Sequence, residues 1–542
     1  MLKQFLAYFF VILMFSACQN KSVDLLVHGG KIYTVDEGFE VHDVMLIRNG
    51  KIIATGGNSL MQNVQAKETL DLKGASVYPG FIDAHCHFTG YAMDFFKLDL
   101  HESHSFLEAI DLMKKFAADN PRQWMEARNW DEHLWTPQSM PDKKSLDLHF
   151  PDRPVIMLRV DGHVALCNQK ALDLAGIQKQ TKVPGGQFEI KNEQLTGFVF
   201  DAAIAEIQKK IPPLNHTEAL KGMQDLEKKC FAFGLTSLTD CWVKSTDLSH
   251  LQNAFQNKKL SIPVTCMLEM SKENIQNWMH QKPYQDDHLH IAGFKIFSDG
   301  ALGSRGACLH EPYLDQANHY GQLSYPQDSL EQMIAQIAKS SYQCCVHAIG
   351  DSAVSSILKM YQKYLPSSNQ RRWRIEHAQV ILLSDTAFFR QWNIIPSVQP
   401  THAMSDMAWA EKRLGAMRLQ NAYLLNTLKN QLGWMPLGTD FPVESPDPLR
   451  TFIAAVFRKN ISRIPQGGFQ IKEALSREDA LRGMTIWAAK ASFDEKYRGS
   501  LEKGKWADFV ILDTDLMEAP ERNVVQSKVL ATYSKGQAVF RK

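Results

Sequence analysis

Two histidines spaced two residues apart, His85 and His87, follow an apolar run at residues 77–84. Side chains alternate between the two faces of a β-strand, so both imidazoles would point the same way while Cys86 points away. Two convergent neutral imidazoles form half of a site for zinc or a similar divalent ion. The alternative is a strand end with two unrelated polar residues, and further ligands along the chain decide between the two.

Other residues able to bind a metal lie at or near the ends of similar apolar runs. These are Lys295, His347, His377 and Asp440. Any one of them alone is more often a hydrogen-bonded structural group than a ligand. Their equivalent positions on different strands favour one shared metal site.

The apolar runs themselves predict the fold. The run that leads to His85 is the first predicted strand. Seven more strand-like runs follow it along the chain, near Leu235–Asp240, Ile262–Glu269, His290–Phe297, Cys344–Ala348, Trp373–His377, Ile394–Gln399 and Met435–Asp440. They alternate with helical patterns, such as the amphipathic stretch Thr217–Phe233, which indicates a parallel sheet of the α/β class. Eight such strands predict a (β/α)8 TIM barrel over residues 77–498, with its active site at the carboxyl ends of the strands.

Short strand signals occur at both ends of the chain. Residues 23–76 contain several, including the hairpin signal Asn49-Gly50, and residues 499–542 contain more. We expect the two segments to form one small β-sandwich domain.

A long insertion, residues 89–216, separates the first barrel strand from the next helix. It has its own helical pattern, Phe106–Ala118, and strand-like runs Trp124–Asn129 and Val155–Asp161. The insertion leaves from the catalytic end of the barrel, so we expect it to cover the active site. The alternative is a peripheral packing domain.

The amino terminus predicts export. Lys3 is followed by apolar residues 5–15 and then by Ser16-Ala17-Cys18. This pattern is typical of a signal peptide, and its end resembles a bacterial lipobox. We therefore expect residues 1–18 to contain the signal and the mature protein to be anchored by lipid on Cys18 in the cell envelope, in the periplasm or at the outer membrane. An ordinary signal peptide with an incidental cysteine is the alternative.

Composition narrows the functional classes. With 542 residues, 44% of them hydrophobic, the chain is long and apolar enough for an ordinary globular enzyme. A net charge of +1, without a basic stripe, argues against nucleic-acid binding. Besides Cys18 there are eight cysteines, without a CxxC pattern, which we expect to be mostly buried apolar side chains. One or two disulfides are the alternative.

The sequence closely resembles the amidohydrolase superfamily, in particular its amidohydrolase-3 (YtcJ-like) branch, which includes N-substituted formamide deformylases. The resemblance covers essentially the whole mature chain. The matching motifs are Pro79–His87, Lys295 with Asp299-Gly300, Val346–Asp351, Glu376–Gln379, Gly438–Asp440 and Gly504–Phe509. The resemblance implies a metal-dependent barrel with a small β domain.

The resemblance also implies how the ligands are shared. His85 and His87 would hold one divalent metal, most simply zinc, while His347 and His377 hold a second. Lys295 would bridge the two ions once its amine is carboxylated, because a free lysine is a cation and a poor ligand. An unmodified Lys295 beside a single metal is the alternative.

Asp440 has the central role in the implied reaction. It would bind the first metal, take a proton from a metal-activated water that attacks a carbonyl, and return that proton to the leaving nitrogen. The expected function is hydrolysis of a non-peptide carbon–nitrogen bond in a small molecule. Hydrolysis of an ester, lactone or carbamate is one alternative, and a non-catalytic metal- or solute-binding lipoprotein is another. Every expected ligand position is filled, which favours an enzyme.

Four further residues are candidates for binding the substrate, and each has a structural alternative. His163 follows a strand-like run in the insertion and would either contact substrate or satisfy loop backbone. Arg305 follows the Lys295 strand and would bind a substrate carbonyl or carboxylate, unless it pairs at the surface with Glu311. Trp130 and Trp135 would line an apolar pocket or pack the core of the insertion.

Overall fold

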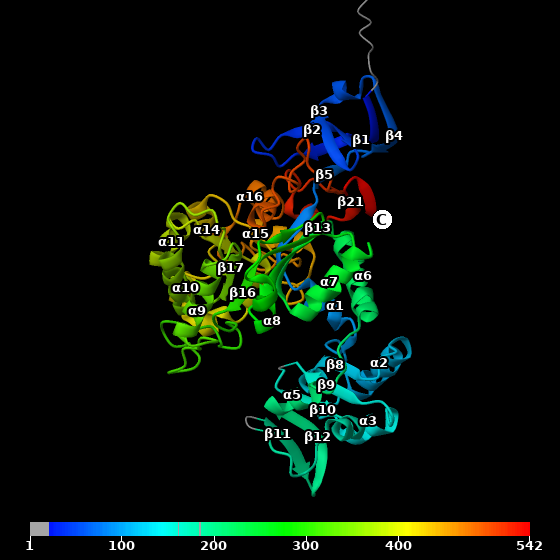
Figure 1. Ribbon diagram of the computed structural model, residues 1–542, viewed down its shortest axis with the longest axis vertical. Coiled ribbons are helices and arrows are strands. Elements are labelled where there is room, and N and C mark those ends of the chain that lie inside the picture. Colours follow the sequence, from blue (N-terminus) through cyan, green and yellow to red (C-terminus); the bar gives the residue numbers. More distant parts are fainter. Residues whose placement is uncertain (1–20, 161, 184–185) are drawn as a thin grey trace, which may run out of the picture.

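The computed structural model describes residues 21–160, 162–183 and 186–542. The predicted signal segment and Cys18 therefore lie outside the described residues. Figure 1 shows three parts along the long axis of the molecule: a small β domain, the barrel, and an inserted domain at the opposite end. Within the described residues, none of the helices has the length and apolar character needed to cross a membrane.

The barrel strands follow the predicted order. Seven strands pair side by side in parallel: β6 (Phe81–Cys86), β13 (Leu235–Val243), β14 (Val264–Glu269), β16 (Leu289–Phe297), β17 (Gln343–Ala348), β18 (Arg374–His377) and β19 (Ile395–Ser397). A two-residue strand, β15 (Tyr284–Gln285), adds antiparallel to β16. The barrel strands are almost wholly buried, as expected when helices cover a parallel sheet.

The eighth position is filled by an irregular segment instead of a regular strand. Leu437 bridges Val398 in parallel, beside β19. On the other side, the Ala84 N–H donates to the Leu437 carbonyl at 3.2 Å, and the Asp440 N–H donates to the His85 carbonyl at 2.7 Å. The predicted eighth strand thus closes the barrel between β19 and β6 through these and a few further bonds, among them those from the Gly438 N–H to the Val398 carbonyl and from the His87 N–H to the Phe441 carbonyl.

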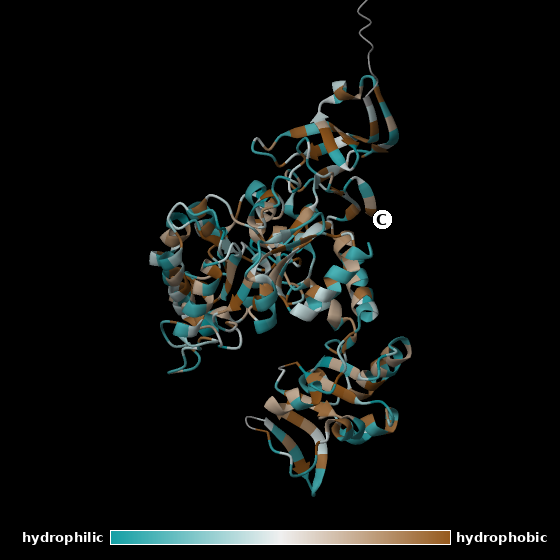
Figure 2. Ribbon diagram, viewed as in Figure 1, coloured by the Kyte–Doolittle hydropathy of each residue, from teal (hydrophilic) through white to brown (hydrophobic). Residues whose placement is uncertain are grey.

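Helices surround the barrel, and their apolar sides pack against its strands in one large core. The predicted helix Thr217–Phe233 is α6 (His216–Ala232), which begins with a capping box between Asn215 and Glu218. The others in this part of the chain are α1 (Phe88–Asp94), α7 (Ser245–Gln256), α8 (Lys272–Trp278), α9 (Gln327–Ala338), α10 (Asp351–Tyr364), α11 (Thr386–Gln391), α12 (Pro400–Asp406), α13 (Ala410–Leu419), α14 (Leu425–Leu432), α15 (Pro448–Phe457), α16 (Arg477–Gly483) and α17 (Ile486–Ala491). Figure 2 shows polar residues along the outer faces of these helices.

Both chain ends join one continuous sheet in the small β domain. Its strands are β1 (Lys21–Tyr33), β2 (Val41–Arg48), β3 (Lys51–Gly56), β4 (Val64–Asp71), β5 (Ser76–Pro79), β20 (Phe509–Leu512), β21 (Val529–Ser534) and β22 (Gln537–Arg541), with α18 (Glu521–Val524) between β20 and β21. Strand β5 pairs with β1 and with β20, so it joins the amino-terminal and carboxyl-terminal halves. Asn49 and Gly50 form the predicted hairpin turn, both at positive φ.

The insertion has its own sheet and its own core. The strands are β7 (Lys97–Asp99), β8 (Met125–Trp130), β9 (Val155–Arg159), β10 (Val164–Cys167), β11 (Gly186–Lys191) and β12 (Gln194–Asp201), and the helices are α2 (Phe106–Asp119), α3 (Lys143–His149), α4 (Gln169–Ala175) and α5 (Ala202–Gln208). Trp130 and Trp135 stack with ring centroids 5.8 Å apart inside this core. They pack the insertion and do not line a pocket of the barrel.

The cysteines behave as buried apolar side chains. All eight in the described residues are unpaired, and only Cys308 is more than slightly exposed. Within this part of the chain the alternative of one or two disulfides is therefore wrong.

Candidate active site

The carboxyl ends of four barrel strands bring the predicted ligands together. His85 is the next-to-last residue of β6, Lys295 and His347 lie near the ends of β16 and β17, and His377 ends β18. The rings of His347 and His377 have centroids 4.5 Å apart, and those of His85 and His377 4.9 Å apart. The parallel barrel explains this convergence, because the ends of all its strands open on one face.

Asp440 completes the cluster from the irregular eighth segment. Its Oδ1 lies 3.3 Å from Nε2 of His85 and 3.1 Å from Nε2 of His87. His87 is the residue before α1, which starts at the end of the first barrel strand. Burial alone would raise the pKa of the Asp440 carboxyl, but the imidazoles of His85, His87 and His377 hold it well below its usual range.

The histidines on β17 and β18 stay neutral at physiological pH. Burial, together with the nearby charge of Lys295, lowers the pKa of His347 to about 3. Burial and the neighbouring His347 lower the pKa of His377 well below its usual value. Neutral imidazoles keep a lone pair for a metal. Lys295 is almost fully buried beside them, with Nζ 4.7 Å from the centre of the Phe297 ring.

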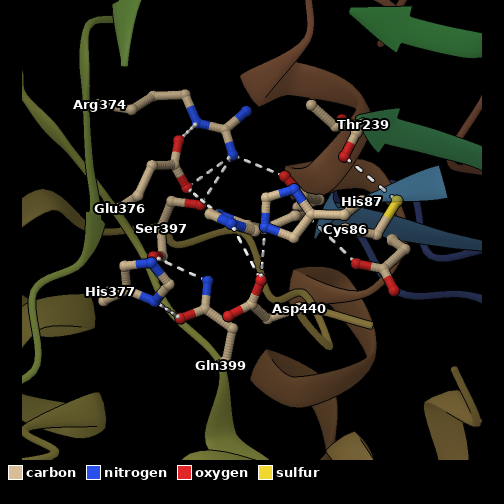
Figure 3. A network of polar contacts seen from close by, with 12 residues as sticks. Cys86, His87, Thr239, Arg374, Glu376, His377, Ser397, Gln399 and Asp440 are labelled. Carbon is tan, nitrogen blue, oxygen red and sulfur yellow. Dashed lines mark hydrogen bonds and ion pairs between the residues drawn. The ribbon is translucent and has the colours of Figure 1, made fainter. Parts of the chain in front are cut away.

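A buried ion network orients His85. Nδ1 of His85 donates to Glu376 Oε2 at 2.5 Å, and Glu376 Oε1 pairs with Arg374 Nε at 2.7 Å. Arg374 also donates through Nη2 to the Ala84 carbonyl and to the Ser397 hydroxyl, at 2.6 and 2.7 Å. Figure 3 shows Arg374 and Glu376 together at one side of the cluster. The network directs Nε2 of His85 toward Asp440, which is the role that a carboxylate behind a metal-binding histidine performs.

Gln399 does the same for His377. Its Oε1 lies 2.8 Å from Nδ1 of His377, and its own amide donates to the Ser397 carbonyl at 3.3 Å (Figure 3). A proton on Nδ1 leaves Nε2 of His377 as the lone-pair nitrogen. His85 and His377 therefore each have a partner behind the ring at Nδ1, which leaves Nε2 as the nitrogen available to a metal.

The donor set fits a divalent cation. The buried polar atoms without a hydrogen-bond partner include Nε2 of His85, Nε2 of His347, Nε2 of His402, Nζ of Lys295 and Oδ1 of Asp440. Ligand atoms of His85, His377 and Asp440 lie within 4.8 Å of one another. Imidazole nitrogens and a carboxylate oxygen are ligands that zinc and similar ions prefer, and a cation between them would satisfy these buried groups.

A cavity of about 470 Å³ opens over this cluster. It is lined by His87, Phe297, Ala301, Leu302, Gly303, His347, Ile349, His377, Gln379, His402, Ser405, Asp406, Trp409, Asp440, Val443 and Glu444. All of these residues belong to the barrel and its loops. Figure 1 shows the insertion projecting away from the barrel body, so the prediction that it covers the site receives no support from this arrangement.

Sequence reasoning missed His402. It lies on α12, five residues beyond the end of β19, and its Nε2 is 3.5 Å from Asp440 Oδ2. No ligand was assigned to the predicted seventh strand, which ends at Gln399, three residues before this histidine. The signal was therefore present, but a histidine within a helix has no strand register to indicate where it points.

The two predicted substrate-binding residues lie outside the cavity lining. The His163 side chain is 75% exposed, and its Nδ1 contacts Asp201 Oδ1 at 2.9 Å. Arg305 donates to both carboxylate oxygens of Asp315, at 3.1 and 2.9 Å. The predicted partner of Arg305 was therefore wrong: Asp315 takes the place of Glu311, which instead lies 3.8 Å from Arg418.

Comparison with known proteins agrees with this geometry. Residues 68–540 match the model of the amidohydrolase family. The chain is 30% identical over 533 residues to the putative amidohydrolase YtcJ of Bacillus subtilis, across 95% of this chain and 99% of that protein. It is 25% identical over 545 residues to N-substituted formamide deformylase of Arthrobacter pascens, across 95% and 97%. A crystal structure of an uncharacterized metal-dependent hydrolase from Pyrococcus horikoshii superposes with a TM-score of 0.78 at 27% identity, covering 92% of this chain and 99% of that one.

Proposed function

This chain belongs to the amidohydrolase family and is a metal-dependent hydrolase, and from that premise we propose that it cleaves a non-peptide carbon–nitrogen bond in a small molecule. The observation that carries the proposal is the position of Asp440. Its Oδ1 lies 3.3 and 3.1 Å from two histidine nitrogens, and the residue lines a cavity of about 470 Å³, which admits a small molecule. Similarity to a formamide deformylase supports an amide as the substrate.

In this proposal the histidines bind the metal and Asp440 transfers the proton. A divalent metal, when bound, lowers the pKa of a water and polarises a carbonyl. His85, His87, His347 and His377 would hold it through ring nitrogens. Low pKa values keep His347 and His377 neutral, whereas the nearby Cys241, Glu376 and Asp440 raise the pKa of His85 against the effect of burial, so metal binding would displace a proton from it. Asp440, ionised over the whole physiological range, takes the proton of the attacking water and returns it to the leaving nitrogen.

We further propose that the metal is zinc and that the site takes two ions, bridged by carboxylated Lys295. The support is the number of donors, which exceeds the four that one tetrahedral zinc uses, and the buried, unpartnered Nζ of Lys295. Elemental analysis of purified protein should approach two metals per chain. A fully active protein with one metal would contradict the bridge.

The choice of carbon–nitrogen bond is tested with matched substrates. Metal-loaded protein is given N-alkyl and N-aryl formamides and acetamides, alongside esters with the same acyl and leaving groups. We expect turnover of at least one amide, lost on chelation and restored by metal. Turnover of esters alone would replace this proposal with the esterase alternative. Glu311→Gln, a surface change outside the cavity, serves as the control variant.

We also propose that the protein is exported and lipid-anchored through Cys18 in a bacterial cell envelope. The support is the sequence alone, in which apolar residues 5–15 precede Ser16-Ala17-Cys18. The described fold begins at β1, immediately after this segment.

A further inference from the structure

The charges around the cavity are unbalanced. Beyond the metal-binding cluster, its polar lining consists of Gln379, His402, Ser405, Asp406 and Glu444. No lysine or arginine is among the described residues that line it. The same cavity contains the buried Oδ1 of Asp440 and Nε2 of His347, which have no hydrogen-bond partner although His85, His87 and Asp299 lie within ion-pair distance, and which belong to the proposed metal site.

The two acids are held in place. Asp406 accepts through Oδ2 from the Tyr423 hydroxyl at 2.8 Å and from the Gln379 amide at 3.0 Å. Glu444 Oε1 accepts from the hydroxyl of Ser405. All of these donors are neutral, so neither carboxylate gains a cationic partner from them. Burial raises the pKa of Asp406 to about 6; the nearby His402 opposes this rise, and the negative charge of Glu444 adds to it.

Two arginines next to residues of the cavity lining bind other groups. Arg305 follows the loop residues that line the cavity, but its guanidinium binds Asp315. Arg413 also binds Asp315 and donates to the Gly303 carbonyl. A substrate with a carboxylate or phosphate beside Asp406 and Glu444 would therefore meet two carboxylates without a lysine or arginine in the cavity lining, which is unfavourable.

One helix carries a residue of each region. His402, next to Asp440, and Asp406 are four residues apart on α12, about one helical turn. The cavity lining also includes apolar side chains, among them Phe297, Ile349 and Trp409.

We propose that this cavity selects amides that carry a protonated amine at the end of a short apolar spacer, with Asp406 and Glu444 binding the ammonium group. The proposal rests on the proposed function, since it names the substrate class of the same site.

The test compares substrates that differ only in the charge of one end group. Each is a formamide with a four-carbon or benzylic spacer that ends in an ammonium, a methyl or a carboxylate group. An ester with the same spacer and end group is prepared for each formamide. We expect kcat/KM for the ammonium compound to exceed that of the methyl compound at least tenfold, with the carboxylate compound lower still. Equal values, or preference for the carboxylate, would overturn the proposal.

Isosteric variants assign the preference to residues. In Asp406→Asn with Glu444→Gln, the ammonium-to-methyl ratio of kcat/KM should fall to within about threefold of one. Because the ratio cancels losses common to both substrates, it separates charge recognition from a damaged site. Each single variant is measured as well, so poor folding of the double variant does not end the test. The control variant Glu311→Gln should keep the wild-type ratio. A wild-type ratio in Asp406→Asn, in Glu444→Gln and in the double variant would contradict the assignment to these two residues.

The same series separates the two proposals. If only the esters turn over, carbon–nitrogen specificity fails, while the charge preference is still measured on the esters. If nothing turns over, calorimetric binding of the three end groups to metal-loaded protein decides. Stronger binding of the ammonium compound, lost in the variants, supports amine selection, and equal binding overturns it.

Discussion

At the scale of single residues, the site depends on the carboxylate behind His85. Glu376 is fully buried between Arg374 and His85, and the Arg374 charge holds its pKa well below the usual range despite burial. An ionised Glu376 keeps the proton of His85 on Nδ1, so Nε2 faces Asp440. The residue next to a metal ligand in sequence thus orients a different ligand on another strand.

Replacing Glu376 by Gln tests this role. The amide fills the same space but binds Nδ1 less strongly and leaves Arg374 without its counter-charge. We expect metal affinity to fall about 10–100-fold, the usual cost of losing such a partner. Competition with a chelator of known affinity measures the change.

Glu495→Gln is the matched control, because it breaks a partly buried arginine pair, with Arg372, away from the cluster. Wild-type metal affinity in Glu376→Gln would show that packing alone orients His85.

At the scale of elements, the sequence could predict what depends on periodicity. Alternation within strand-like runs placed His85 beside His87, and eight such runs identified the barrel. Periodicity in the sequence could not predict contacts between side chains on opposite sides of the barrel. The eighth segment is irregular, and His402 lies in a helix whose rotation depends on packing. The direction of the insertion also depends on contacts that sequence periodicity does not encode.

Closure of the barrel gives a prediction at this scale. A Cβ on Gly438 would lie 2.6 Å from the backbone nitrogen of His85. Gly438→Ala should therefore push the eighth segment away from β6, lower the free energy of unfolding by about 1–3 kcal/mol, and weaken metal binding. Urea denaturation and chelator competition measure the two effects.

Gly90→Ala is the control for this experiment. Gly90 is near the same site, but a Cβ there meets no atom closer than 3.9 Å, and alanine favours the helix. If both variants behave like wild type, the close contact at Gly438 does not hold the strand ends together.

At the scale of the whole molecule, both ends of the chain meet in the small β domain, away from the insertion (Figure 1). A lipid on Cys18 would therefore attach the molecule to a membrane through the β domain. We expect wild-type protein to partition into the detergent phase and to incorporate labelled lipid, and Cys18→Ala to do neither. Cys308→Ala, at a cysteine inside the folded part, should behave like wild type. Equal labelling of wild type and Cys18→Ala would contradict the anchor.

The central claim is that Asp440 moves the proton in a metal-loaded site, and Asp440→Asn tests it most directly. The substitution keeps the shape and one acceptor oxygen but removes the base. With metal content measured on the same sample, we expect a folded protein that retains much of its metal and turns over a confirmed substrate about 10²–10⁴-fold more slowly. Asp287→Asn, at an exposed aspartate, should keep wild-type turnover. Wild-type turnover by fully metal-loaded Asp440→Asn would contradict the mechanism and place the base elsewhere.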